Sequence, residues 1–371
     1  MILPSIMPDE LARSYLGRIC RLNGIMSPAT LRPQIEQAVA SVSEDPEGCY
    51  WVELLAAVTQ KTTQEFIAQH TVLSFRRAVR PEFDCLNHGN RRDSRERFCH
   101  VYPLGLTESI HHLCPACATE DLAFWGTSYW RRSHQLKAVA RCEKHGLGLH
   151  HLKTAKWISL PHDVVAQSIP FDASIVDDAA QNPVIARYAE ICSALAERDC
   201  PVSTNQMVQT IRHQFEKVNA KRDASGSRLS TLVIDRIRGP WQRHFFEDLT
   251  GSNSVPNTES LERTQSCVRL AYATHFYALV LAALFESAEQ AIVEVSRPTV
   301  ATVLRKMQST DRQQSAVSLD DPLQNTPLTA AARAFFSGTS IADACRIHGG
   351  NPRQLEALLR VAAEPLRLVL E

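Results

Sequence analysis

The sequence predicts a mainly α protein with a small metal-binding module at its centre. Apolar residues recur at helical spacing in the first and last thirds of the chain, whereas strand-like alternation is scarce throughout. Between these regions lie two short turns rich in cysteine and histidine, which are typical of a metal site with little β structure around it. With 371 residues, 44% of them hydrophobic, the chain is long enough to form two or three packed domains.

We expect four segments: an amino-terminal helical, helix-turn-helix-like domain (1–75), a zinc-binding module (76–160), a helical domain (161–310) and a carboxy-terminal helix-turn-helix (311–371). In the first segment, apolar stripes and turn residues predict four helices. Their expected ranges are Asp9–Leu22, Leu31–Val42, Val52–Thr59, and a last helix that ends at His70 and is capped by a threonine of Lys61-Thr62-Thr63.

The net charge is zero, because 40 Lys and Arg balance 40 Asp and Glu. This balance argues against a protein that binds nucleic acid strongly and without base specificity, although a neutral chain can still have local basic patches. The arginine-rich stretch Phe75–Arg97 favours a solvated connector over a nucleic-acid or partner contact. The sequence leaves a second zinc site near this stretch undecided, because its candidate ligands are irregularly spaced: Cys85, His88, Cys99 and His100.

The main candidate site consists of Cys114-Pro-Ala-Cys117 and Cys142-Glu-Lys-His145. A gap of two residues lets one tight turn direct both of its ligands at one ion, and zinc takes four such thiolate or imidazole ligands. We therefore expect Zn²⁺ on Cys114, Cys117, Cys142 and His145. With all four positions filled by protein, the metal would stabilise structure and leave no open position for catalysis.

A mixed aromatic and basic run, Tyr129–Leu136, lies between the two turns. Tyr129 and Trp130 are expected to pack on the ligand turns, since a metal-anchored module has little core of its own. Arg131 and Arg132 are candidates for a nucleic-acid or partner contact, with surface or supporting roles favoured over catalysis.

From Asn182 onward the pattern is helical. The expected helices are Ile185–Leu195, Thr204–Val218, Arg228–Ile237, Pro240–Leu249, Leu261–Phe285 and Ala288–Val295. The run Leu270–Phe285 is the most apolar, but it is shorter than a bilayer span and contains His275, which favours a buried helix and no membrane role.

The pattern of the last segment predicts a helix-turn-helix. Its expected helices are Ala330–Phe336, a second helix that is capped at Gly338-Thr339-Ser340 and ends at His348, and a third helix over Pro352–Val361. A helical hairpin that docks on another protein fits equally well. In the DNA-binding alternative, the polar face would consist of Arg346, Arg353, Gln354 and Arg360. The scattered cysteines and the absence of a signal-peptide pattern at Met1 favour a bacterial cytoplasmic protein.

These motifs together resemble the TniQ/TnsD family of transposon target-selection proteins. The similar residues are Pro8-Asp-Glu-Leu11 with Ser14, Tyr15, Leu16 and Arg18, CPAC at 114–117, YWRRSHQL at 129–136, Cys142–Leu149, and the helix Arg269–Phe285. Glu143 departs from the family pattern, which has proline in the second chelating turn.

The resemblance implies an adaptor and not an enzyme. Such a protein would recognise target DNA or a CRISPR Cascade complex with its guide RNA, recruit the AAA+ ATPase of the transposon (TnsC/TniB-like), and form a homodimer. Its length favours docking on Cascade. The sequence is consistent with an adaptor, since it has no phosphate-binding loop and no acidic cluster for a pair of metal ions. The alternatives are a free-standing zinc-containing helix-turn-helix transcription regulator, and a zinc hydrolase with His134 or Glu143 as its base.

Overall fold

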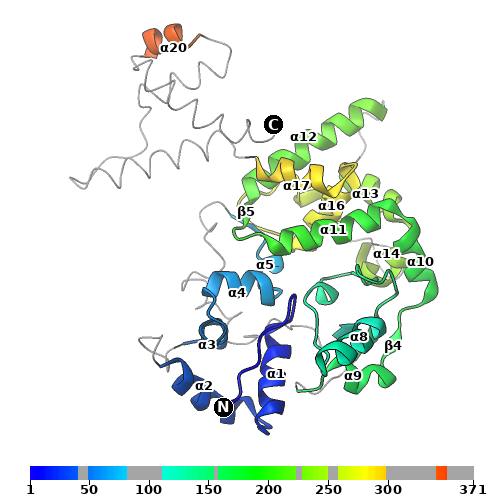
Figure 1. The fold of residues 1–371 in the computed structure, drawn as a ribbon. Helices are drawn as coiled ribbons and strands as arrows, with labels where there is room; N and C mark the ends of the chain where they lie inside the picture. Colours follow the sequence, from blue (N-terminus) through cyan, green and yellow to red (C-terminus); the bar gives the residue numbers. More distant parts are fainter. Residues whose placement is uncertain are drawn as a thin grey trace. The chain divides into compact units, whose positions relative to one another are not determined.

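The computed structural model describes residues 1–40, 49–81, 111–153, 158–222, 228–249, 258–297 and 340–348. The protein is mainly α, as the sequence predicts, with a few very short strands in the described part of the chain. Two compact units are present, Met1–Ser296 and Arg297–Glu371 (Figure 1). The predicted boundaries after residues 75 and 160 fall inside the first unit and stay predictions.

The amino-terminal helices surround a core of their own, which includes Leu16, Ile35, Leu55 and Phe66. These helices are α1 (Ala12–Leu22), α2 (Pro28–Val39), α3 (Trp51–Val58), α4 (Thr63–His70) and the short α5 (Leu73–Arg76). The first helix begins three residues later than predicted, because Asp9 has a left-handed backbone (φ 56°) and Glu10 bridges to Arg131. The second begins earlier than predicted, with Pro28 in its first turn, a favoured position for proline.

The predicted cap of α4 is present at Thr62. Its hydroxyl accepts a hydrogen bond from the Glu65 backbone N–H at 3.2 Å, and the Glu65 carboxylate accepts one from the Thr62 N–H at 2.9 Å. This reciprocal pair satisfies two donors that a helix end otherwise leaves free.

Replacing Thr62 by alanine is expected to destabilise the protein by about 1 kcal/mol, because one N-terminal N–H of α4 then loses its acceptor. Thr63→Ala is the matched control, since Thr63 is the first residue of the helix and Thr62 is its cap. Chemical denaturation of both variants tests this prediction, and equal stabilities would contradict it.

Short strands connect the middle of the chain to its flanks. The three-stranded antiparallel sheet consists of β2 (His111–Leu113), β3 (His150–Leu152) and β4 (Ile169–Pro170), with β3 in the centre. A parallel pair joins β1 (Val79–Arg80) to β5 (Val202–Ser203). The other elements of this region are α8 (Pro115–Trp125), η2 (Ser133–Gln135), α9 (Pro161–Val164) and η3 (Val165–Gln167).

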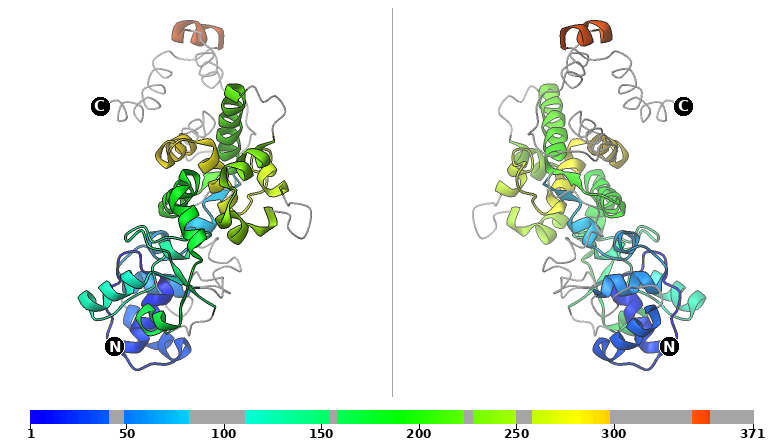
Figure 2. Two further views of the ribbon diagram at one scale, coloured as in Figure 1. Left: turned by 90° about the vertical axis from the view of Figure 1, so that its right-hand side faces the viewer. Right: turned by 90° about the vertical axis from the view of Figure 1, so that its left-hand side faces the viewer.

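The second half of the first unit is helical, with α16 (Thr274–Leu284) at its centre. Every residue of α16 from Tyr277 to Leu284 is buried, and the helix packs against α11 (Figure 2). The remaining elements are α10 (Ala173–Gln181), α11 (Pro183–Glu197), α12 (Thr204–Arg222), α13 (Leu229–Ile237), α14 (Pro240–Phe245), η4 (Glu247–Leu249), α15 (Glu259–Arg263) and α17 (Ala288–Ser296).

The single helix predicted over Leu261–Phe285 is wrong, because two helices, α15 and α16, cover this range. Just after α15, the Thr264 hydroxyl donates to the Leu261 carbonyl at 2.6 Å. Such a side-chain bond competes with the continuing helical pattern. The predicted burial is confirmed for Tyr277–Phe285, whereas Leu270, at the start of the apolar run, is exposed. Among the described helices none is by itself long and apolar enough to cross a membrane; α16 and α17 pass that test only as a pair, and a bend of 117° separates them.

Two buried aromatic residues bind the middle segment, which contains both chelating turns, to the helical half of the unit. The Tyr188 hydroxyl of α11 donates to the Lys137 carbonyl at 2.8 Å, and the Trp241 indole N–H of α14 donates to the Ala138 carbonyl at 3.0 Å. Gly239 lets the start of α14 approach α10, since a Cβ there would clash with the Asp178 carboxylate, which accepts a hydrogen bond from the Trp241 N–H at 3.0 Å. The residues between the two chelating turns therefore share one core with α11 and α14.

In the second unit the structure describes α20 (Ile341–His348). This helix matches its prediction, and the Ser340 hydroxyl accepts a hydrogen bond from the Asp343 N–H at 3.1 Å. Arg346 is exposed and pairs with Asp343 at 2.7 Å. The two flanking predicted helices, 330–336 and 352–361, lie outside the described residues.

Candidate metal centre

The first chelating turn coincides with the start of α8. Cys114 is its N-cap and Pro115 its first residue, so Cys117 falls in the first helical turn. The two thiols therefore lie close to each other at a helix N-terminus, where the backbone dipole favours negative charge. Both cysteines are almost fully buried.

The second chelating turn is a tight loop closed by backbone hydrogen bonds. The Cys142 N–H donates to the Leu147 carbonyl and the Gly146 N–H donates to the Cys142 carbonyl, both at 2.8 Å. Gly146 has a φ of +65°, a left-handed conformation that glycine adopts without strain. This turn directs the Cys142 sulfur and His145 Nδ1 toward the first pair of thiols.

All four predicted ligands meet in one place, with their donor atoms within 4.8 Å of one another. Cys117 Sγ lies 3.6 Å from Cys142 Sγ, and His145 Nδ1 lies 3.3–3.6 Å from the three sulfurs. In a tetrahedral zinc site, Zn–S and Zn–N bond lengths place sulfur pairs about 3.8 Å apart and sulfur–nitrogen pairs about 3.6 Å apart. The spacing of these donors therefore fits a single tetrahedral ion.

The charges of the cluster also fit a cation. Hydrogen bonds from the Cys117 and Cys142 thiols lower the pKa of Cys114 to about 3. Hydrogen bonds with Cys114 and Cys142 raise the pKa of Cys117. The pKa of Cys142 is also lowered, to about 7, so ionisation is favoured at two of the thiols and opposed at Cys117. A divalent cation would remove this conflict, because all three sulfurs could then ionise together.

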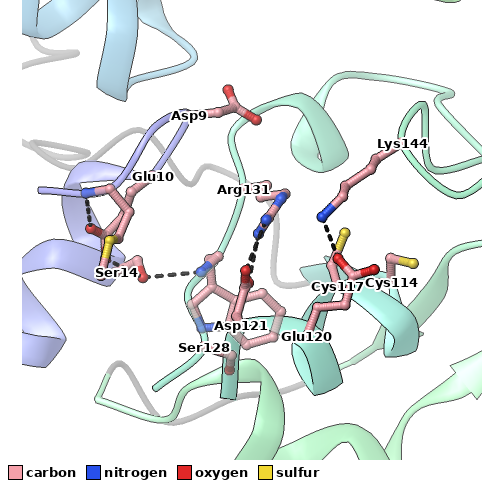
Figure 3. A network of polar contacts seen from close by, with 12 residues as sticks. Asp9, Glu10, Ser14, Cys114, Cys117, Glu120, Asp121, Ser128, Arg131 and Lys144 are labelled. Carbon is pink, nitrogen blue, oxygen red and sulfur yellow. Dashed lines mark hydrogen bonds and ion pairs between the residues drawn. The ribbon is translucent and has the colours of Figure 1, made fainter. Parts of the chain in front are cut away.

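A carboxylate supports the histidine from the outer side. His145 Nε2 lies 2.8 Å from Glu120 Oε1, while the second oxygen of Glu120 pairs with Lys144 (Figure 3). With Nε2 donating its proton to Glu120, Nδ1 presents a lone pair toward the sulfurs. The hydrogen bond to Glu120 is also the main reason why the pKa of His145 is raised. Glu120 therefore orients the ring and increases its basicity as a ligand.

Glu120→Gln is expected to lower the affinity for the metal about 10- to 100-fold, the usual effect of removing such a supporting carboxylate. Competition against a chromophoric chelator measures this affinity. Glu143→Gln is the matched control, since it removes the same charge from an exposed position within the second turn. Equal affinities of the two variants would contradict the role of Glu120.

The amino-terminal motif binds the segment between the two chelating turns. Glu10 is fully buried and forms two hydrogen bonds with Arg18, at 2.7 and 2.8 Å. Ser14 donates to Glu10 and accepts from the Trp130 N–H at 3.0 Å, and Leu11 N–H donates to the Trp130 carbonyl at 2.9 Å. Two motifs more than a hundred residues apart thus form one hydrogen-bonded unit.

Both arginines of the central run are paired inside this unit. Arg131 forms a bidentate pair with Asp121, at 2.7 and 3.0 Å (Figure 3). Its guanidinium lies 4.3 Å from the centre of the Tyr129 ring. Arg132 pairs with Asp9 at 3.1 Å and donates to the Ala68 carbonyl of α4. Their predicted contact with nucleic acid or a partner stays a prediction, because in this fold the two side chains are mostly buried and join α8, α4 and the amino terminus.

The remaining predicted site residues lie in the second unit or outside the described residues. Arg346 is exposed on α20 in the second unit, and the other predicted contacts lie outside the described residues: Arg353, Gln354 and Arg360. The candidate second zinc ligands also lie outside them: Cys85, His88, Cys99 and His100.

Sequence reasoning missed four acidic residues that support the centre: Asp9, Glu10, Glu120 and Asp121. The last two carry a local signal, since they follow Cys117 by three and four residues and share its helix face. Asp9 and Glu10 belong to the amino-terminal motif that resembles the family, but the sequence contained no sign of their pairing, because Asp9 contacts the central run more than a hundred residues away.

Fold and site define a mainly α protein whose middle segment holds a Cys₃His cluster suited to a metal ion. Residues 1–149 match the TniQ family model, so this part of the chain is TniQ-like, as the sequence predicts. The matched range ends just after the second chelating turn and includes the amino-terminal motif. Comparison with curated proteins gives no match. The TniQ match indicates a role in the choice of a transposition target.

Proposed function

We propose that this protein is a zinc-containing adaptor for DNA transposition, which links a target-recognition complex to the AAA+ ATPase of the transposon. The observation that carries the proposal is the overlap between the TniQ match and one structural unit. The TniQ match covers residues 1–149, and the same residues contain the hydrogen-bonded unit made of the amino-terminal motif, the central run and the Cys₃His cluster. Zinc is the metal we propose for this cluster, because thiolate and imidazole donors at tetrahedral spacing suit it.

In this role the protein binds and positions other macromolecules and leaves the chemistry to them. The proposed partners are a TnsC/TniB-like ATPase on one side and, on the other, target DNA or a CRISPR Cascade complex with its guide RNA. A homodimer is also proposed. The metal would stabilise the middle segment, since protein side chains occupy four positions around it and zinc sites of this kind stabilise folds.

Co-purification tests the proposal most directly. The tagged protein is co-expressed with the AAA+ protein, transposase and any Cascade subunits encoded beside its gene, and the bound proteins are identified. The expected result is a complex with the ATPase that survives nuclease treatment. Absence of the ATPase at every salt concentration, with the tagged protein folded and metal-loaded, would contradict the adaptor role.

A second function, a free-standing zinc-containing transcription regulator, is favoured by α20, a capped helix with an exposed arginine in the second unit. A gel-shift titration on random duplex DNA distinguishes the two. A regulator binds at sub-micromolar concentrations with a steep loss of affinity as salt rises. The adaptor is expected to show weak binding to such duplexes.

A further inference from the structure

The middle residue of the short helix η2, His134, lies against the metal cluster. It is 5% exposed, and it lines one cavity together with Cys142 and a second, of about 10 Å³, together with Cys114 and Cys117. Its side chain forms a hydrogen bond with the Cys142 sulfur. A metal-bound thiolate has no proton and can only accept, so the ring nitrogen that faces this sulfur carries the hydrogen.

The cluster requires such donors because its charge is buried. Three thiolates and one divalent ion leave a net negative charge, and the three cysteines are almost fully buried. A buried charge is costly unless hydrogen bonds compensate it. Backbone N–H groups at the start of α8 donate to Cys114, and the His145 N–H donates to Cys142. His134 adds a donor from a side chain, which a substitution can remove.

Contacts on both sides of His134 fix its position. Before it, the Ser133 N–H and hydroxyl both donate to Asp9 Oδ2, at 3.1 and 2.6 Å. After it, the Gln135 side chain accepts from the His112 N–H at 3.0 Å and donates to the His112 carbonyl at 2.7 Å. The His134 carbonyl accepts from His112 Nδ1 at 3.2 Å. The amino-terminal motif on one side and strand β2 on the other therefore hold η2 in place.

We propose that His134 is a positioning residue of the metal centre, which donates a hydrogen bond to the metal-bound Cys142 thiolate and withdraws negative charge from this sulfur. Hydrogen bonds to ligand sulfurs tune thiolate metal sites, and residues that support ligands in this way contribute to metal affinity. Because Asp9 holds Ser133, the bond also connects the amino-terminal motif to the metal. The inference rests on the metal proposed for the cluster, but not on the transposition role.

NMR spectroscopy of the full-length protein loaded with ¹¹³Cd²⁺ tests the hydrogen bond directly. The histidine side chains are labelled with ¹⁵N. The expected result is a scalar coupling between the His134 ring N–H proton and the ¹¹³Cd nucleus, which passes through the hydrogen bond and the Cys142 sulfur. Bound cadmium without this coupling overturns the inference and leaves the metal assignment standing. Failure of cadmium to bind overturns both.

Three variants separate this role from packing. His134→Leu removes the donor, so the affinity for zinc should fall about 10-fold. The sulfur-to-cobalt charge-transfer band of the same variant loaded with Co²⁺ should move to longer wavelength, because the sulfur lone pairs rise in energy without the donor. His134→Gln keeps a side-chain N–H and should restore most of both values. His275→Leu, which removes a half-buried histidine of α16 outside the cluster, is the matched control and should leave the band unchanged.

A His134→Leu band at the parent's wavelength overturns the inference. A band that moves as far in His275→Leu as in His134→Leu overturns it as well, because the shift would then report packing alone. If His134→Leu does not fold, the coupling measured in the parent protein decides.

Discussion

Cys142→Ser is expected to abolish metal binding and to unfold the middle segment. The serine hydroxyl is a poor ligand at neutral pH, and the three remaining donors leave the tetrahedron incomplete. Structural zinc contributes on the order of 10 kcal/mol of binding free energy in small finger peptides, and this energy is coupled to folding. Because the turn containing Cys142 shares a core with α11 and α14, we expect a large drop in melting temperature as well. Metal analysis and thermal denaturation measure the two effects.

Cys192→Ala is the control for this experiment. Cys192 is fully buried in α11, but it is not part of the cluster, so the variant loses packing while its metal content stays at the parent's value. The exposed Cys200 provides a second control, for which neither quantity should change. A Cys142→Ser protein that melts normally and retains its metal would refute the assignment of the ligands.

Arg18→Met is expected to destabilise the first unit by about 3–5 kcal/mol, because it leaves the buried Glu10 carboxylate without its cation. Glu10 also holds Ser14 and, through it, the Trp130 backbone, so the amino-terminal motif should separate from the central run. Limited proteolysis should then cut between residues 1 and 11. The double variant Glu10→Gln/Arg18→Met should be less unstable than Arg18→Met, since it contains no unpaired charge.

The same pair predicts a pH dependence. Burial raises the pKa of Glu10 above its ordinary value, an effect that Arg18 opposes in the parent protein. Without Arg18 the pKa rises further. A raised carboxyl pKa gives stability at low pH that is lost as the pH increases, because the folded state then holds a buried charge that the unfolded state hydrates. The stability difference between Arg18→Met and the parent should therefore shrink as the pH is lowered from neutral toward the ordinary carboxyl pKa. A difference independent of pH would contradict the role of Glu10.

The sequence predicted the features that depend on neighbouring residues. The helix after Thr62, the buried helix around Tyr277 and the two chelating turns all follow from periodicity, capping or ligand spacing over a few positions. The break between α15 and α16 was missed, because the competing side-chain bond of Thr264 is too weak a signal in a long apolar pattern.

The sequence did not predict features that depend on pairing between residues far apart in the chain. Strands β1 and β5 have two residues each, too few for a visible alternation, and they pair across more than a hundred positions. The central arginines illustrate the same limit for the site. Arg132 has the charge of a contact residue in the sequence, but its burial is decided by Asp9 and by the Ala68 carbonyl, which the fold alone brings to it.

The central claim is that one metal ion binds Cys114, Cys117, Cys142 and His145 and stabilises the middle segment. X-ray absorption spectroscopy of the purified protein, combined with metal analysis, tests it most directly. We predict one zinc per chain at this cluster, with three sulfur ligands at about 2.3 Å and one nitrogen ligand at about 2.0 Å. A folded middle segment without metal, or a zinc shell that contains oxygen in place of these donors, would contradict the claim.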